Sequence, residues 1–251
     1  MENAIEFLAT PKRRPRFVTA IAQTEAEVIE AQRLRYRVFA DEMGASIPHA
    51  QSGLDRDKFD PFCEHLLVRD SECGRIVGTY RILTAAKARH TGGFYSRREF
   101  FLDNLASLNS TTVEVGRACV DAQYRSGAVI ATLWAGLSAH IIECGYEYVI
   151  GCGSVPLSDG GRLASSIYAR VKKEFLSPPE WRVSPRCPFP LATQIDPDPI
   201  LPPLLKGYLR LGAYVCGEPA WDTDFKTADL LIMLPMRQMN RRYLSRFQRT
   251  A

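Results

Sequence analysis

Strand-like and helix-like segments follow one another along this chain in an order that few architectures can accommodate. Short segments rich in β-branched and aromatic residues are typical of strands, and they occur at 17–22, 65–69, 75–83, 111–120, 148–151 and 229–234. Helical patterns occupy 24 to 39 or 43, 127–144, 161–175 and 204–211. This order predicts an α/β fold in which a mixed sheet carries helices on its faces.

Local signals support several of these boundaries. Thr24 followed by Glu27 has the spacing of a capping box and predicts the start of the first helix. Within that helix, Arg35 and Phe39 share one face because they are four residues apart. Gly116 lies inside a predicted strand, where glycine often marks a bulge or a close approach of backbone.

The length of 251 residues suits one domain, 1–251, with three attached segments. Residues 1–16 form a basic arm, and residues 178–203 form a proline-rich loop. This loop carries Trp181 and Phe189, so we expect it to wrap around the body. Residues 236–251 contain five arginines and no acid. Such basic ends suggest an anionic partner: an acidic carrier protein, an anionic membrane or nucleic acid.

Several classes of protein are excluded. The chain has no run of about 18 apolar residues, so we expect no membrane span. The first residues lack the pattern of a signal peptide, and we expect a cytoplasmic location. The seven cysteines form no CxxC pair and do not alternate with the four histidines at zinc-ligand spacing. Free thiols, with no disulfide framework and no metal, are therefore expected.

Charged residues that could carry chemistry fall into four clusters. Each cluster could also be structural, because acids in loops are usually solvated and arginines often pair internally. An internal ion-pair network of Arg35, Asp60 and Glu114 with Arg117 is one such alternative. The clusters are Arg35-x-x-x-Phe39 with Glu42, Asp57-x-x-Asp60 before His65, Arg81, and Glu114-x-x-Arg117 leading to Arg125-x-Gly127.

In order and approximate spacing, these clusters resemble the acyl-homoserine-lactone synthases, which belong to the GNAT-like acyltransferases. The L-ornithine N-α-acyltransferase family is a closer resemblance. It is carried by L-R-Y-R-V-F-A-D-E-M-G-A, E-H-L-L-V-R-D, I-V-G-T-Y-R-I-L, E-V-G-R-A-C-V, P-P-E-W-R-V, L-P-P-L-L-K-G-Y-L-R-L-G-A and G-E-P-A-W-D. The similarity runs from about Arg33 to Met236. It implies a GNAT-like, mostly antiparallel twisted sheet flanked by helices on both faces.

The resemblance also implies direct attack of an amine on a thioester, with no bound cofactor. The amine must lose a proton to a nearby base; Glu114 is the first candidate and His65 the second, and Arg117 is placed with them at the catalytic centre. A backbone N–H near Gly116 could hold the developing oxyanion. Expected contacts with the pantetheine and the oxyanion are Val115, Gly116, Arg125 and Gly127. Expected contacts with the acceptor are Arg35, Phe39, Glu42, Asp57, Asp60 and Arg81.

The donor and acceptor follow from the same resemblance. The usual coenzyme A loop has glycines where this chain has Ala128 and Ile130, so side chains would crowd a pyrophosphate. Acyl carrier protein is the expected donor, and an amino acid, most simply L-ornithine, is the expected acceptor. The apolar and basic residues after Met236 repeat at helical spacing, which suits either an anionic membrane surface or packing on the body.

Alternatives remain at this point. Another N-acyl amino acid synthase or a homoserine-lactone synthase would share the mechanism, and a coenzyme A-dependent acetyltransferase would differ in the donor. A non-catalytic basic protein that binds membrane or nucleic acid is a different class. The acids at Asp55, Asp57 and Asp60 argue against nucleic acid, because they would repel phosphate.

Overall fold

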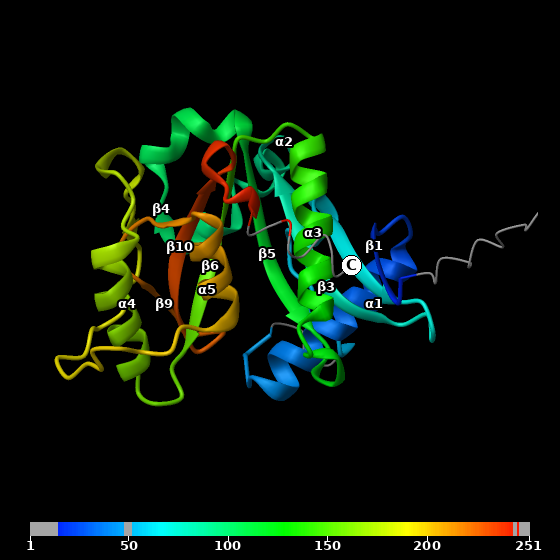
Figure 1. Ribbon diagram of the computed structural model, residues 1–251, viewed down its shortest axis with the longest axis horizontal. Helices are drawn as coiled ribbons and strands as arrows, with labels where there is room; N and C mark the ends of the chain where they lie inside the picture. The colour runs from blue at the N-terminus through cyan, green and yellow to red at the C-terminus, as the bar shows by residue number, and fades with distance from the viewer. Residues whose placement is uncertain (1–14, 48–51, 243–244, 246–251) are drawn as a thin grey trace, which may run out of the picture.

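A twisted, mostly antiparallel sheet forms the centre of the molecule (Figure 1). The computed structural model describes residues 15–47, 52–242 and 245. Every neighbouring pair of strands is antiparallel except β5 and β6, which are parallel. The strands, in their spatial order, are β1 (Phe17–Ile21), β2 (Glu64–Asp70), β3 (Ile76–Thr84), β5 (Thr112–Val120), β6 (Tyr148–Pro156), β10 (Thr227–Pro235) and β8 (Tyr214–Val215), with β9 (Ala220–Asp222) also paired to β10.

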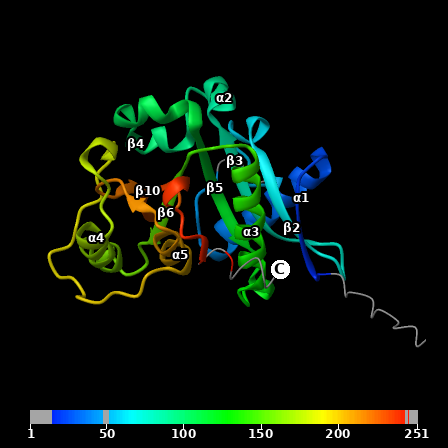
Figure 2. The ribbon, with the colours of Figure 1, turned by 45° about the horizontal axis from the view of Figure 1, so that its top comes forward.

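Two helices cover opposite faces of the β1–β5 half of this sheet (Figure 1, Figure 2). Along β2, Leu66 and Val68 pack on the side of α3 (Ala128–Glu143), whereas Leu67 packs on the side of α1 (Glu25–Tyr36). This alternation is what the two-residue period of a strand dictates when both of its faces are buried. The GNAT-like fold class predicted from the sequence is confirmed.

The other half of the sheet carries α4 (Arg162–Glu174) and α5 (Pro203–Leu211). Ile167 of α4 and Leu205 of α5 share a core cluster with Leu230 of β10. The long segment between β3 and β5 contains only short elements, including one strand of a separate two-stranded sheet. The remaining elements are α2 (Ala85–Ala88), β4 (Phe100–Phe101) paired with β7 (Ser184–Pro185), and the 3₁₀ helices η3 (Asp60–Phe62), η4 (Arg89–Thr91), η5 (Tyr95–Arg98), η6 (Asp103–Thr111), η7 (Ala122–Tyr124), η8 (Pro179–Trp181) and η9 (Met236–Gln238).

The first helix begins and ends with features that matter for the site. Its capping box is present: the Glu27 N–H donates to the Thr24 hydroxyl at 3.3 Å, and the Thr24 N–H donates to the Glu27 carboxylate at 3.3 Å. After Tyr36 the chain continues directly into a π-helical turn, η1 (Arg37–Glu42). Such wider turns recur at functional sites, and this one carries Phe39 to the central cavity.

Two strands differ from their sequence-based prediction. β6 continues to Pro156 rather than ending at Gly151, because Gly151 and Gly153 fit where neighbouring groups approach closely. On β5, the register against β3 shifts between Thr79 and Arg81. The residue with positive φ at this bulge is Arg117, at 52°, and not Gly116, where a Cβ atom would meet open space.

The proline-rich stretch lies against α4. The Ala192 N–H donates to the Ser165 hydroxyl at 2.8 Å, and Arg170 pairs with Asp198 at 2.8 Å. Residues 1–14 of the basic arm and most of the segment after residue 242 lie outside the described residues. The division into one domain with three attached segments stays a prediction. Among the described residues, no helix is both long and apolar enough to cross a membrane.

Candidate active site

A cavity of about 650 Å³ opens where β5 and β6 separate. Their ladder ends at the pair Glu114 and Ile150, although both strands run six residues further, to Val120 and Pro156. At the end of the ladder the backbones still almost touch, since a Cβ atom on Gly151 would lie 2.4 Å from the Val115 carbonyl oxygen. The lining of the cavity includes residues from both faces of the sheet, Phe39 on the α1 side and Trp134 on the α3 side.

On the α3 side the cavity is apolar. Trp134 projects from α3 toward α5, where Gly207 leaves room for its indole. Within this part, the hydroxyls of Tyr80 and Tyr208 hydrogen bond to each other. The apolar lining consists mainly of Trp134, Leu137, Ile141, Val149, Leu204 and Leu234.

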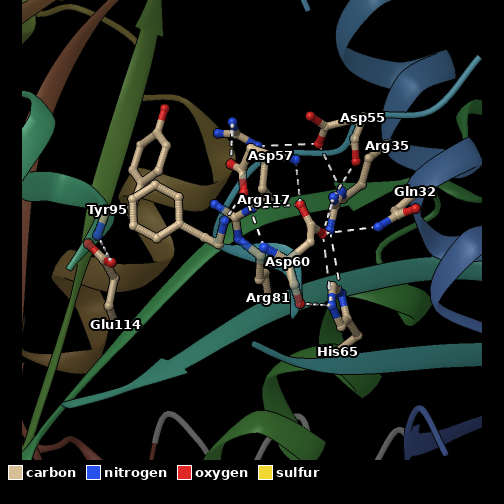
Figure 3. A network of polar contacts seen from close by, with 11 residues as sticks. Gln32, Arg35, Asp55, Asp57, Asp60, His65, Arg81, Tyr95, Glu114 and Arg117 are labelled. Carbon is tan, nitrogen blue, oxygen red and sulfur yellow. Dashed lines mark hydrogen bonds and ion pairs between the residues drawn. The ribbon is translucent and has the colours of Figure 1, made fainter. Parts of the chain in front are cut away.

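On the opposite side lies a buried network of arginines and aspartates (Figure 3). Arg35, which is fully buried, donates to Asp55 at 2.8 Å and to Asp60 at 2.6 Å. Arg81 donates to Asp57 at 2.8 Å and to Asp60 at 3.2 Å. Arg117 completes the group through ion pairs with Asp55 at 3.2 Å and Asp57 at 3.6 Å. Three guanidinium groups thus face three carboxylates, and their charges balance.

Opposing effects act on the pKa of Asp60. Burial alone would raise it, but the guanidinium groups of Arg35 and Arg81 outweigh burial and hold the pKa well below its usual range. Asp60 is therefore a permanent anion that links the two arginines. This pairing fixes the loop after η1 against β2 and β3, because Arg81 is part of β3 and Asp60 begins η3.

Only the outer members of the network reach the cavity. Arg81 and Arg117 line it, whereas Arg35 and the three aspartates lie behind them. The Arg117 guanidinium lies over the rings of Tyr95 at 4.9 Å and Phe225 at 4.4 Å. Stacking of this kind orients the guanidinium at the cavity wall.

Glu114 stands apart from the network (Figure 3). It lines the cavity from the end of the β5–β6 ladder and is 5% exposed. One carboxylate oxygen accepts the backbone N–H of Tyr95 at 2.5 Å, and the other accepts that of Ser96 at 2.8 Å. Burial raises the pKa of Glu114, and these hydrogen bonds offset part of the rise. A raised pKa brings a carboxylate nearer to the range useful for proton transfer at neutral pH.

The second candidate base, His65, is placed differently. It is 2% exposed and does not line the cavity. Its Nδ1 faces Arg35 at 3.5 Å, and its Nε2 faces the Asp60 carbonyl oxygen at 3.3 Å. Burial, followed by the charge of Arg35, lowers the pKa of His65. The structure therefore puts this imidazole inside the network, on the far side of the arginines from the cavity.

The remaining predicted residues come together around the cavity. Arg125 forms an ion pair with Glu42 at 2.6 Å, and both side chains are partly exposed at 49% and 34%. Gly127 takes a φ of +95° immediately before α3, a conformation that favours glycine. Six of the predicted residues form this part of the lining: Phe39, Glu42, Val115, Gly116, Arg125 and Gly127.

The fold also assembles a group that sequence spacing did not reveal. Glu99, Cys152 and Asp229 each offer a ligand atom, and these atoms lie within 4.8 Å of one another. Asp222 lies near enough to raise the pKa of both acids. These residues belong to segments far apart in the chain, so no local motif could have indicated them. Tyr95, which packs under Arg117, was missed for the same reason.

Comparison with known proteins places this geometry in a family. Residues 34–135 match the model described as "Acetyltransferase (GNAT) domain". An L-ornithine N(alpha)-acyltransferase of Rhizobium meliloti is 38% identical over 250 residues, covering 90% of this chain and 82% of the relative. That of Brucella abortus is 34% identical over 247 residues, covering 90% and 86%.

Solved structures agree on the fold. A CoA-dependent acyl-homoserine lactone synthase, BjaI, with SAM and isopentyl-CoA, has a TM-score of 0.55 at 16% identity, covering 93% of this chain and 88% of that one. FeeM, an N-acyl amino acid synthase from uncultured soil microbes, has a TM-score of 0.53 at 14% identity, covering 88% and 93%. With the relatives above, the conclusion is direct: this chain is an acyltransferase with a GNAT fold, and it belongs to the L-ornithine N(alpha)-acyltransferase family.

Proposed function

We propose that this enzyme transfers a (3-hydroxy)fatty acyl group from acyl carrier protein to the α-amine of L-ornithine, giving lyso-ornithine lipid. The observation that carries the proposal is the cavity, lined from both faces of the sheet, where β5 and β6 separate. Its apolar half suits an acyl chain, and its charged half suits an amino acid. Gly116 lines the cavity just beyond the end of the β5–β6 ladder, and the thioester is proposed to meet the amine there.

The reaction needs no covalent enzyme intermediate. The neutral amine attacks the thioester carbonyl, a C–N bond forms, and the C–S bond breaks as the pantetheine thiolate leaves. Gly116 and Arg117, at the bulge in β5, both line the cavity. A backbone N–H there is our candidate donor for the oxyanion of the tetrahedral intermediate.

Glu114 is our candidate for the group that takes the proton of the amine. It lines the cavity near Gly116, and burial raises its pKa. The proton then passes to the leaving thiolate, which restores the carboxylate. Glu114 also fixes the backbone of Tyr95 and Ser96, so a substitution tests both roles.

The arginines at the cavity are proposed to hold the acceptor's carboxylate. Arg117 is the better placed, because Tyr95 and Phe225 orient its guanidinium, and Arg81 lies beside it. A bidentate guanidinium–carboxylate pair would fix the orientation of the α-amine. Arg35, Asp57, Asp60 and His65 then position these two arginines and the loop beside them, and do not contact the acceptor.

Residues at the rim of the cavity favour acyl carrier protein over coenzyme A as the acyl donor. Ile130 lines the cavity in the first turn of α3, where a coenzyme A pyrophosphate would need space. A carrier protein presents its pantetheine through a single phosphodiester and would tolerate this side chain. Exposed Arg125 at the rim provides a positive charge for an acidic carrier surface.

The enzyme is further proposed to be cytoplasmic and to dock at the inner face of an anionic membrane, where it would release lyso-ornithine lipid directly into the membrane. The arginines of the C-terminal segment supply the charge for this docking, with Met239 packed on Leu211. Co-sedimentation with anionic and with neutral vesicles tests it, and equal binding to both would remove the electrostatic part of the proposal.

The central test is mass spectrometry of products made from 3-hydroxyacyl carrier protein and an equimolar mixture of amino acids. We expect acyl-ornithine from the unmodified enzyme, and at least about 100-fold less from Glu114→Gln. Glu143→Gln, an exposed acid on α3, is the matched control. Acylation of a different amino acid would overturn the acceptor, and a fully active Glu114→Gln would overturn the base.

A further inference from the structure

A buried acidic pair borders the charged half of the cavity. Glu99 follows η5, and Asp229 lies in β10. Cys152 of β6 lies between them, two residues beyond the last residue of β6 that pairs with β5. Cys152, Asp222 and Asp229 line the cavity. Asp229 therefore lies at the cavity, and Glu99 adjoins it without lining the cavity itself.

The two acids lack the cationic partners that the aspartates of the arginine network have. Asp229 is 4% exposed, and its carboxylate accepts the Thr227 hydroxyl at 2.7 Å. One oxygen of Glu99 accepts the Cys152 thiol at 3.4 Å, and its other oxygen, Oε1, is shielded from solvent and has no hydrogen-bond partner among the described residues. Within the part of the chain that the structure describes, no lysine or arginine forms an ion pair with Glu99, Asp222 or Asp229.

Acids in such a place tend to keep a proton or to bind a cation. Burial, then the charges of Asp229 and Asp222, raises the pKa of Glu99 well above its usual value. A cation that entered would take the place of a proton held by these acids and would satisfy the Oε1 atom of Glu99. A buried acid oxygen without a partner is costly, so the site favours a ligand that donates hydrogen bonds and carries positive charge.

The position of Glu99 and Asp229 relative to Arg117 indicates which kind of cation the two acids would bind. Tyr95 connects the two groups: its phenol interacts with Arg117 and also with Glu99 and Asp222. The charged half of the cavity thus has a guanidinium at one end and carboxylates at the other. A ligand with a carboxylate at one end and an ammonium group several bonds away matches this polarity.

We infer that Glu99 and Asp229 form the subsite for the side-chain ammonium of a diamino acid acceptor, with Asp222 adding negative charge nearby. This inference rests on the proposed function and adds the residues that select its acceptor. The acids that the sequence analysis expects to contact the acceptor are instead Asp57, Asp60 and Glu42. In the structure those three acids are paired with Arg81, Arg35 and Arg125, so they are already neutralised.

The test compares ornithine with norvaline, which has the same carbon chain and no side-chain amine. In Glu99→Gln and Asp229→Asn, kcat/KM for ornithine should fall roughly tenfold or more, mainly through KM, since a charged hydrogen bond is lost. The ratio of the values for ornithine and norvaline should fall with it. Glu143→Gln should keep the ratio of the unmodified enzyme. Equilibrium binding of both amino acids, measured by calorimetry on the same variants, should show the same loss for ornithine.

Each other outcome has a distinct meaning. If kcat falls by the same factor for ornithine and for norvaline, the inference is overturned, because these acids would then be the proton acceptor or a structural element. The inference is also overturned if a chelator abolishes the preference for ornithine over norvaline and zinc restores it. Glu99, Cys152 and Asp229 would then hold a metal ion. If the enzyme forms no acyl amino acid but still binds ornithine through Glu99, the proposed function fails and the subsite stands. Equal binding of both amino acids overturns the subsite alone.

Discussion

Gly207 of α5 packs so closely against Trp134 of α3 that a Cβ atom on this glycine would lie 1.7 Å from the indole ring. The next residue, Tyr208, hydrogen bonds to Tyr80 of β3. These two contacts fix α5 over the apolar half of the cavity, and with it the space that is left for an acyl chain. The missing side chain of Gly207 is therefore part of the site's shape.

Gly207→Ala should displace α5. Overpacking of this kind typically costs about 1–3 kcal/mol of folding stability, and the displaced helix should change which acyl lengths are accepted. Trp134→Phe in the same chain removes the atoms that clash and should restore most of the stability. Urea denaturation and product analysis with a series of acyl lengths measure both effects. Lys206→Ala, an exposed change on the same helix, is the control, and a Gly207→Ala enzyme as stable as this control would contradict the prediction.

Asp60→Asn should destabilise the protein by about 3–5 kcal/mol, because it leaves Arg35 and Arg81 short of a buried counter-charge. The pKa of Asp60 is lowered in the folded state, so its contribution is present above the unfolded pKa of about 4 and is lost as the pH falls below it. Unfolding of the unmodified protein at pH 5 and at pH 2 should show this loss, because the contribution disappears only below the unfolded pKa, as the pH approaches the lowered folded pKa. The free energy of unfolding of Asp60→Asn should depend less on pH over this range. That of Asp103→Asn should depend on pH as it does in the unmodified protein.

Glu99→Gln should have the opposite effect on stability. The pKa of Glu99 is raised in the folded state, so ionisation of this acid favours unfolding as the pH rises above its unfolded pKa of about 4. The amide cannot ionise, so the substitution should raise Tm at pH 8 by about 2–4 °C for each kcal/mol of repulsion removed. At pH 4 the gain should be much smaller. Scanning calorimetry at the two pH values measures it, and a lower Tm at pH 8 would show that the Glu99 carboxylate is paired after all.

Much of the fold was readable from the sequence because its signals are local. The capping box at Thr24 and Glu27 and the strand composition of β3 depend on neighbours in the chain. β6 was predicted too short, since the reason for Gly151 is a contact with Val115 on another strand. The bulge was expected at Gly116 but has its positive φ at Arg117, where the network and the rings of Tyr95 and Phe225 hold the side chain.

The site was predictable only in part, for the same physical reason. The family resemblance of short segments pointed to Arg81, Glu114 and Arg117, and the structure places all three at the cavity. The sequence could not show that Asp57 and Asp60 would be neutralised by arginines from other segments. Nor could it bring together Glu99 and Asp229, which are 130 residues apart in the chain and meet only through the packing of η5 against the sheet.

Arg125 offers the sharpest test of the donor. It is half exposed at the cavity rim and pairs with Glu42. Arg125→Glu would place two acids together there and repel an acidic carrier, so KM for acyl carrier protein should rise about tenfold at low salt and less at high salt. The KM for a small acyl-pantetheine thioester should rise far less, because this donor brings no protein surface. Arg162→Glu, an exposed change on α4, controls for net charge. Equal loss with both donors would mean that Arg125 acts on the pantetheine itself and that the carrier docks elsewhere.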